Sequence, residues 1–370
     1  MPATTNGTGL ERSAGGPVAS VIVPARNEEE CLGRCLESLA AQQGVSFEVL
    51  LVDDGSTDRT REIAESFAQV QVMDAGPLPA GWSGKNHAAW QGAQRARGRW
   101  LLFTDADTVH EAGSLAASVA EAEQHGVALL SYSPRQEVEG FWERALMPVV
   151  FAELAVTYPP SRVCDPHSPV AAANGQYLMI SREAYDAIGG HRAVAGSLLE
   201  DVAIARRVKD SGRTLRFRFG GDAVRARMYH SFGQMWEGWT KNLALLFAHP
   251  VRLAALRSLE FLAVAAGAAL GLVALTQDWR PLAAAAFLAA AILWGVFLRR
   301  IRRAHFGTAA NGLAIVGLPL FAALLLRSHR HHQEGRSVEW KGRMYPQASS
   351  GAEALEAVRV PAAETLETIR

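Results

Sequence analysis

Short apolar strands alternate with amphipathic helices through the first hundred residues, and this alternation limits the fold more than any other feature of the chain. The expected strands are residues 18–24, 47–52, 70–73 and 100–104, and the expected helices between them are residues 28–42, 57–67 and 86–97. Strands separated by helices of this length favour an α/β fold with a doubly wound, mostly parallel sheet. In such a sheet, ligands bind beyond the carboxyl ends of the strands.

Three long apolar segments follow, at residues 261–276, 281–298 and 306–326, and none of them contains a charged residue. Each is roughly long enough to cross a hydrocarbon layer about 30 Å thick. We therefore expect a flexible tail at 1–17, an α/β domain at 18–255, membrane segments at 256–328 and a C-terminal tail at 329–370.

The composition excludes a disordered chain and a disulfide scaffold, and it gives no indication of nucleic-acid binding. Of the 370 residues, 49% are hydrophobic and 20% are charged, which excludes a disordered chain. The 37 Lys and Arg balance 37 Asp and Glu, so the basic excess typical of nucleic-acid-binding proteins is absent and we expect no nucleic-acid partner. Three cysteines exclude a disulfide scaffold and favour reduced thiols.

The basic residues at 299–303 predict the orientation in the membrane. Basic loops stay in the cytoplasm, so the first two apolar segments should form a hairpin and the α/β domain should face the cytoplasm. The expected location is therefore the cell membrane, with several crossings. The third segment has basic residues on both flanks and contains the sequence Gly-Leu-Pro at 317–319. A full span and a re-entrant or interfacial helix pair both remain open for it.

Polar clusters follow the predicted strands at residues 24–28, 53–58 and 105–107, and a further cluster lies at 81–85. Asp105 and Asp107 present two carboxylates on alternate residues, a pattern that suits Mg²⁺ or Mn²⁺ bridging to a diphosphate. A solvated turn is the structural alternative for this pair. Lys85 follows a glycine and could meet a phosphate as a point charge, or could simply belong to a glycine loop before a helix.

An acidic pair, Glu200 and Asp201, begins an amphipathic helix expected at residues 198–207. Asp201 would suit a general base if a pocket faces it, although acidic groups also stabilise the first turn of a helix. His230 is a candidate third metal ligand, a phosphate contact or an ordinary loop residue. The apolar stretch at 141–158 belongs either to the core or to a membrane interface that guides a lipid.

The order of the motifs at 23–28, 52–58, 105–107 and 200–201 resembles that of the family 2 inverting glycosyltransferases, which have the GT-A fold. This resemblance covers about residues 18–245. The stretches at 81–85, 227–241 and 338–345 are similar to those of the membrane-bound branch that glycosylates carotenoids. Ceramide glucosyltransferases and a hopanoid-associated group are similar but more distant.

The resemblance implies a role for each matching residue. The nucleotide-sugar site would comprise Pro24, Arg26, Asn27, Glu28, Asp53, Asp54, Gly55, Ser56, Lys85 and Asp105. Asp105 and Asp107, with His230, would hold the Mg²⁺ or Mn²⁺, and Asp201 would be the catalytic base beside Glu200. The acceptor or donor side would include Gln234, Trp239, Trp340 and Arg343.

The expected reaction is a metal-dependent transfer of a hexose with inversion, using UDP-glucose as the family's usual donor. The expected acceptor is lipophilic: a carotenoid hydroxyl or carboxylate, or alternatively a hopanoid, a polyprenyl phosphate or another membrane lipid. Many processive or lipid-acting relatives carry a Gln-x-x-Arg-Trp motif, whereas residues 234–239 here lack the Arg and change the spacing, which puts polymerising activity in doubt. A non-enzymatic membrane scaffold is the remaining alternative, and the intact carboxylates argue against it.

Overall fold

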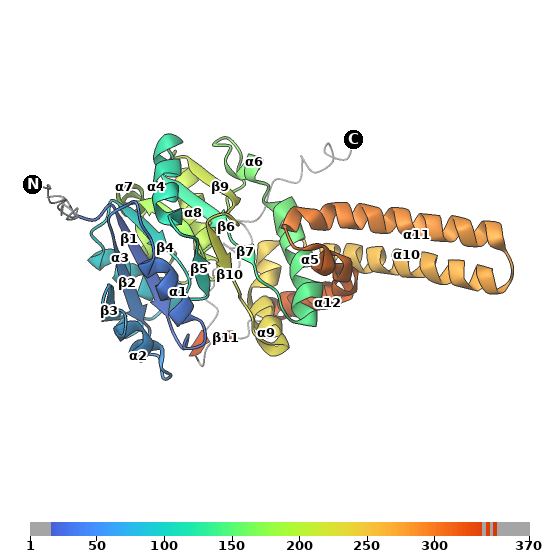
Figure 1. Cartoon of the computed structure of the whole chain (residues 1–370), viewed down its shortest axis with the longest axis horizontal. Coiled ribbons are helices and arrows are strands. Elements are labelled where there is room, and N and C mark those ends of the chain that lie inside the picture. The colour runs from blue at the N-terminus through green and yellow to red at the C-terminus, as the bar shows by residue number, and fades with distance from the viewer. Residues whose placement is uncertain (1–15, 335–337, 341–342, 346–370) are drawn as a thin grey trace, which may run out of the picture.

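A seven-stranded sheet forms the centre of the N-terminal part of the chain (Figure 1). The computed structural model describes residues 16–334, 338–340 and 343–345. The strand order is β3-β2-β1-β4-β8-β6-β9, and only β8 runs antiparallel to its neighbours. The strands are β1 (Ala19–Ala25), β2 (Phe47–Asp53), β3 (Val70–Asp74), β4 (Trp100–Phe103), β6 (Leu129–Ser133), β8 (Leu178–Ser181) and β9 (Leu215–Phe219). The mostly parallel α/β sheet predicted from the alternation is confirmed.

Helices cover both faces of this sheet. They are α1 (Leu32–Ala40), α2 (Thr60–Glu65), α3 (Gly84–Arg95), α4 (Ser114–Gln124), α6 (Pro160–Val163), α7 (Arg182–Ala187) and α8 (Glu200–Asp210). Successive residues of a strand point to opposite faces, so Val21 packs among α1 and α4 while Ile22 packs among α3 and α8. Both faces are therefore apolar, which explains why the strand sequences are continuous apolar runs rather than alternating ones.

The helix predicted at 28–42 begins later than expected, at Leu32. Asn27 adopts the left-handed conformation with φ of 52°, and the backbone N–H groups of Asn27 and Glu28 donate to the hydroxyls of Ser56 and Thr60. These bonds hold the end of β1 as a turn instead of a helical start. The turn lies at the carboxyl edge of the sheet.

A second layer of structure lies between the large sheet and the apolar helices. A small sheet has the order β5-β10-β7, with β5 at Thr108–His110, β7 at Arg135–Gln136 and β10 at Val224–Ala226. Beyond it lie α5 (Phe141–Thr157) and α9 (Phe232–Asn242). Their buried side chains form a separate apolar cluster with the C-terminal helices. The stretch at 141–158 therefore packs at the junction between the α/β domain and those helices.

Three helices of the described chain are long and apolar enough to cross a membrane: α10 (Pro250–Thr276), α11 (Arg280–Ile301) and α12 (Thr308–Gln333). Figure 1 shows α10 and α11 as a hairpin that projects away from the rest of the molecule. Only 11% of the most apolar stretch of α10 is buried, and 22% of that of α11, against 50% for α12. The hairpin thus exposes an extended apolar surface, which fits membrane association.

The third apolar helix packs along α5, α9 and the hairpin helix α10 (Figure 1). A Cβ at Gly317 would overlap the carbonyl oxygen of Ala145, so glycine is what allows α12 to approach α5 this closely. The hydroxyl oxygen of Ser328, near the other end of α12, accepts a hydrogen bond from the backbone N–H of Ala244. The helix runs without a break through Pro319, so the helix pair considered from the sequence does not form.

A cluster of four charges ties the base of the hairpin to α5. Arg257 of α10 donates to both carboxylate oxygens of Glu153, and Arg300 of α11 pairs with Glu153 and Glu260. All four side chains are at most 16% exposed. Two positive and two negative charges balance, which makes the burial of these groups tolerable.

The final described strands, β11 (Val338–Trp340) and β12 (Arg343–Tyr345), pair antiparallel, with Trp340 opposite Arg343. The C-terminal tail expected from residue 329 begins within α12, which runs to Gln333. The side chains of Trp340 and Arg343, residues 1–15 of the expected N-terminal tail, and residues 335–337, 341–342 and 346–370 lie outside the described part of the chain.

Candidate active site

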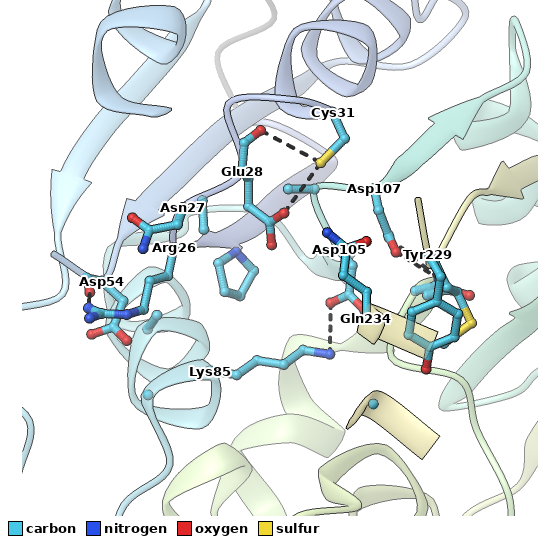
Figure 2. Close-up of a pocket in the computed structure, with 18 of the residues that line it drawn as sticks. Arg26, Asn27, Glu28, Cys31, Asp54, Lys85, Asp105, Asp107, Tyr229 and Gln234 are labelled. Carbon is cyan, nitrogen blue, oxygen red and sulfur yellow. Dashed lines mark hydrogen bonds and ion pairs between the residues drawn. The ribbon is translucent and has the colours of Figure 1, made fainter. Parts of the chain in front are cut away.

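A polar cavity of about 580 Å³ lies at the carboxyl ends of the central strands. Side chains from three strand ends converge on it, as Figure 2 shows: Arg26, Asn27 and Glu28 after β1, Asp54 after β2, and Asp105 and Asp107 after β4. Pro24, within β1, lines the same wall. The expectation that polar clusters at separate strand ends meet in space follows from the parallel arrangement.

The turn after β2 presents Asp54, not Asp53, to this cavity. The Asp53 carboxylate accepts hydrogen bonds from the backbone N–H and the hydroxyl of Ser56. Gly55 has φ of 69°, a left-handed conformation that favours glycine. Asp53, Gly55 and Ser56 do not line the cavity but build the turn beside it. The guanidinium of Arg26 donates to the backbone carbonyls of Asp54 and Gly55, which fixes that side chain across the turn.

Lys85 extends from the first turn of α3 into the centre of the site (Figure 2). Its Nζ lies 2.7 Å from Oδ1 of Asp105 and 2.9 Å from Oε1 of Glu200. Burial opposes the charged form, but the two carboxylates outweigh it and raise the pKa of Lys85 well above its usual value. Lys85 is therefore a permanent cation within reach of any phosphate that enters the cavity.

Asp105 and Asp107 give the site an excess of negative charge. Burial, followed by the charges of Asp105 and Glu28, raises the pKa of Asp107 to about 8. Gln176 donates to both carboxylate oxygens of Asp107, at 3.3 and 3.4 Å. A partly buried group of hard carboxylate oxygens with unfavourable mutual repulsion is the donor set that suits Mg²⁺ or Mn²⁺.

No group of three His, Cys, Asp or Glu side chains within the described residues is arranged to hold a metal ion without other ligands. His230 is exposed at the rim of the polar cavity, where its backbone N–H donates to the Gln234 side chain. The two aspartates therefore fit a cation only if other oxygens complete its coordination. A diphosphate is a ligand of that kind.

Asp201 lies in the first turn of α8, next to Glu200. Its two carboxylate oxygens accept hydrogen bonds from the backbone N–H groups of Gly175, at 2.9 Å, and Val202, at 2.8 Å. Burial, followed by the charge of Glu200, raises its pKa to about 7. A Cβ at Gly175 would lie 2.9 Å from Nζ of Lys85, so glycine leaves room for the lysine here.

Asp201 lines a second, largely apolar cavity of about 310 Å³ that adjoins the first. Lys85, Asp105 and Glu200 border both cavities. Part of its wall comes from α5 and the residue after it, from the end of β9 and from the turn after α11: Phe151, Leu154, Tyr158, Phe219, Arg303, Ala304 and His305. The two cavities together can hold a polar and an apolar ligand on opposite sides of one group of carboxylates.

The two α9 residues expected on the acceptor or donor side border different cavities. Gln234 borders the polar cavity, and Trp239 borders the apolar one. Sequence reasoning missed Gln176 and Lys241; burial lowers the pKa of Lys241, at the polar cavity, to about 8. Gln176 follows an Asn-Gly pair before a strand and Lys241 ends the quoted motif at 227–241, so weak signals existed for both.

Comparison with known proteins gives a consistent result. The model of "Glycosyl transferase family 2" matches residues 20–189. The 4,4'-diaponeurosporenoate glycosyltransferase of Staphylococcus aureus strain MRSA252 is 30% identical over 340 residues, which is 88% of each chain. The protein of that name from strain USA300 is 31% identical over 233 residues, 61% of this chain and 60% of its own.

Among solved structures, similarity is weaker. A Pyrobaculum calidifontis mannosyltransferase in complex with GDP-Man and Mn²⁺ has a TM-score of 0.48 at 18% identity, covering 86% of this chain and 88% of its own. Glucosyl-3-phosphoglycerate synthase of Mycobacterium tuberculosis has a TM-score of 0.43 at 19% identity, covering 62% of this chain and 78% of its own.

Proposed function

The chain belongs to glycosyl transferase family 2 and is a glycosyltransferase, and from this premise we propose that it transfers glucose from UDP-glucose to a lipophilic acceptor. One observation carries the proposal: a polar cavity and an apolar cavity meet at a single group of partly buried charges, Lys85, Asp105 and Glu200. The polar cavity suits a nucleoside diphosphate sugar, and the apolar cavity suits an acceptor drawn from the membrane.

The donor binds with its nucleoside along the strand ends. Arg26, Asn27, Glu28 and Asp54 border that end of the polar cavity and offer hydrogen bonds to a uracil and a ribose. The nearby turn of Asp53, Gly55 and Ser56 holds this wall in place. Lys85 meets the diphosphate as a point charge once phosphate oxygens compete with Asp105 for its ammonium group.

Asp105 and Asp107 would hold Mg²⁺ or Mn²⁺ when the donor is bound, and His230 at the rim is a further candidate ligand. Such a cation offsets the charge that develops on the departing nucleoside diphosphate. The crowding of Asp105, Asp107 and Glu28, which raises the pKa of Asp107, supports this assignment because a divalent cation would relieve it.

Asp201 acts as the general base from the acceptor side. Its raised pKa lets it accept a proton from an acceptor hydroxyl near neutral pH, and if the acceptor is a carboxylate it orients the nucleophile instead. Since Asp201 borders the apolar cavity and the donor occupies the polar one, attack comes from the side opposite the leaving group. That geometry favours a single displacement with inversion.

The acceptor is most simply a carotenoid hydroxyl or carboxylate. This choice is supported by the Staphylococcus aureus relative that aligns with 88% of this chain and 88% of its own length, and that is named for glycosylation of the carotenoid acid diaponeurosporenoate. A hopanoid, a polyprenyl phosphate or another membrane lipid is the alternative, and the apolar lining of the second cavity favours any of these over a soluble sugar acceptor.

In the membrane, we propose that α10 and α11 span as a hairpin and α12 lies at the cytoplasmic surface. Both ends of α12 contact the catalytic side: Phe306, just before it, packs on Phe151, and Ser328 bonds Ala244. A helix held at both ends by one domain cannot also carry its second end across a bilayer. The catalytic domain and the basic loop at 299–303 then share the cytoplasmic side.

The test is transfer by the purified full-length chain in liposomes. UDP-glucose, Mn²⁺ and a carotenoid carboxylic acid should yield a glucosylated lipid detectable by mass spectrometry, with UDP released in proportion. Proton NMR of the product should show the β configuration that inversion of an α-linked donor requires. The Asp201→Asn protein should be inactive, and acceptor-independent or absent UDP release from the unmodified chain would refute the proposal.

A further inference from the structure

The turn between α11 and α12 forms part of the wall of the second cavity, together with Phe219 at the end of β9. The His305 ring stacks on the Phe219 ring with centroids 4.1 Å apart and an interplanar angle of 11°. His305 has φ of 59°, a left-handed conformation that is uncommon for residues other than glycine. A segment that links two apolar helices is thus held in a strained conformation against the catalytic domain.

The second cavity is small for a lipid. Its volume of about 310 Å³ lies at the lower end of the range for small-molecule pockets, roughly 300–1,000 Å³. A long apolar molecule could place only one end inside it, and the rest would have to leave between the cavity's walls. Those walls include Phe151 and Leu154 of α5 and the turn at 303–305, which adjoin the exposed hairpin.

Two side chains in the lining of this cavity have polar atoms without partners among the described residues. Trp239 is 5% exposed, and its indole Nε1–H has no hydrogen-bond partner among the described residues. The same holds for the buried Oδ1 of Asn242. Both residues line the cavity, as does the Asp201 carboxylate. Buried donors and acceptors in folded proteins are normally satisfied, so an unpaired donor and an unpaired acceptor in the lining of one cavity point to a ligand group that can bond both.

We propose that the second cavity binds the reacting end of an acceptor that has an oxygen-bearing head and a long apolar body. We further propose that His305 contacts this body and so favours acceptors in which it is long. The head lies between Asp201, Trp239 and Asn242, and the body passes the His305–Phe219 pair toward the lipid. This inference rests on the proposed glycosyl transfer and adds a specificity-determining residue outside the catalytic domain's own motifs.

The first experiment separates recognition of the body from recognition of the head. Retinoic acid and sorbic acid share a polyene carboxylic acid head and differ in the length of the apolar body. We expect His305→Gly, in full-length protein in liposomes with UDP-glucose, to raise KM for retinoic acid about tenfold, the scale of losing an apolar contact in a pocket. The kcat, the KM for UDP-glucose and the kinetics with sorbic acid should stay unchanged.

Glycine is chosen because it accepts the left-handed conformation without strain, so the variant removes the ring without forcing the turn to change. The matched control is Asp278→Gly in the turn between α10 and α11, where φ is 54° and the residue is exposed and outside the cavity. Equal effects of His305→Gly on both acceptors, or no effect on either, would overturn the proposal.

The second experiment reads binding without turnover. A long-chain fatty acid with a diazirine a few carbons from its carboxylate should label the turn at 303–305 or the adjoining part of α12, and excess retinoic acid should displace it. His305→Gly should lower this labelling. Labelling confined to the exposed faces of α10 and α11 would overturn the inference even if transfer occurs. Displaceable labelling of the turn without any transfer would refute the proposed function and leave this binding site standing.

Discussion

The Lys85 ammonium lies 2.7 Å from the Asp105 carboxylate, at the boundary between the polar and the apolar cavity. Glu200 completes the arrangement at 2.9 Å from the same nitrogen. The three charges stand between the strand ends expected to hold the donor and the Asp201 carboxylate expected to activate the acceptor. A change of charge at Lys85 or Glu200 should therefore shift the pKa of Asp201.

Activity should rise with pH through the range in which Asp201 ionises. Burial and the Glu200 charge raise its pKa to about 7, so Asp201 is protonated below that pH and is a base above it. We expect kcat/KM with a hydroxyl acceptor to rise about tenfold per pH unit below pH 7 and to level off above it. A pH profile measured at constant ionic strength checks this, and a flat profile between pH 5 and about 8 would contradict the role of Asp201.

Neutralising Glu200 and neutralising Lys85 should shift the rising part of the pH profile of kcat/KM in opposite directions. Glu200→Gln removes a negative charge that raises the pKa of Asp201, so the rising part should shift to lower pH. Lys85→Met removes a positive charge that lowers it, so the rising part should shift to higher pH. Shifts of the same sign in both variants would mean that a different group sets the rising part.

Loss of Asp107 should abolish the metal dependence of turnover. Removal of one charged ligand from a cation that faces a diphosphate costs several kcal/mol, or on the order of 10³-fold in rate. We expect this loss in Asp107→Asn, together with weaker Mn²⁺ binding in the presence of UDP by calorimetry. Asp74→Asn at the exposed end of β3 is the control and should behave like the unmodified chain. Near-normal Mn²⁺-dependent turnover in folded Asp107→Asn would exclude the assignment.

The close contact of α12 with α5 should be sensitive to a single methyl group. Gly317→Ala places a Cβ against the Ala145 carbonyl and should cost about 1–3 kcal/mol, as overpacking does. Gly312→Ala on the same helix meets no atom within 4 Å and should be neutral or stabilising by up to about 1 kcal/mol. Thermal unfolding midpoints in detergent compare the two, and equal midpoints would show that the helices are not in this contact.

Labelling in intact cells should place the two turns of the hairpin on opposite sides of the membrane. Arg302 is exposed whereas the neighbouring Ile301 is fully buried, so Arg302→Cys is the position to test. An impermeant maleimide should label Trp279→Cys and not Arg302→Cys, both in a background without Cys164, whose thiol is only partly buried. An epitope after Arg370 should resist external protease. Labelling of Arg302→Cys but not of Trp279→Cys would show that the hairpin has the opposite orientation.

Local patterns in the sequence were enough to predict the first four strands, the polar groups at their ends and the three apolar segments. Each of these depends on neighbours close in the chain: β-branched runs make strands, and uncharged runs of about 20 residues suit lipid. The convergence of Arg26, Asp54 and Asp105 also followed, because parallel strands bring their carboxyl ends to one edge. Burial of Glu153 could not be inferred, since its partners Arg257 and Arg300 are more than 100 residues away.

Only the tertiary structure decided which residues of each motif face the cavity and what lies behind Asp201. Asp54 lines the polar cavity and Asp53 does not, although both are buried, and nothing in the local sequence distinguishes the two aspartates. The course of α12 depends on a contact between Gly317 and Ala145, and the second cavity is assembled from α5, β9 and the turn at His305. Such features are set by packing between segments distant in the chain, where the energy of each contact depends on shapes that no local pattern encodes.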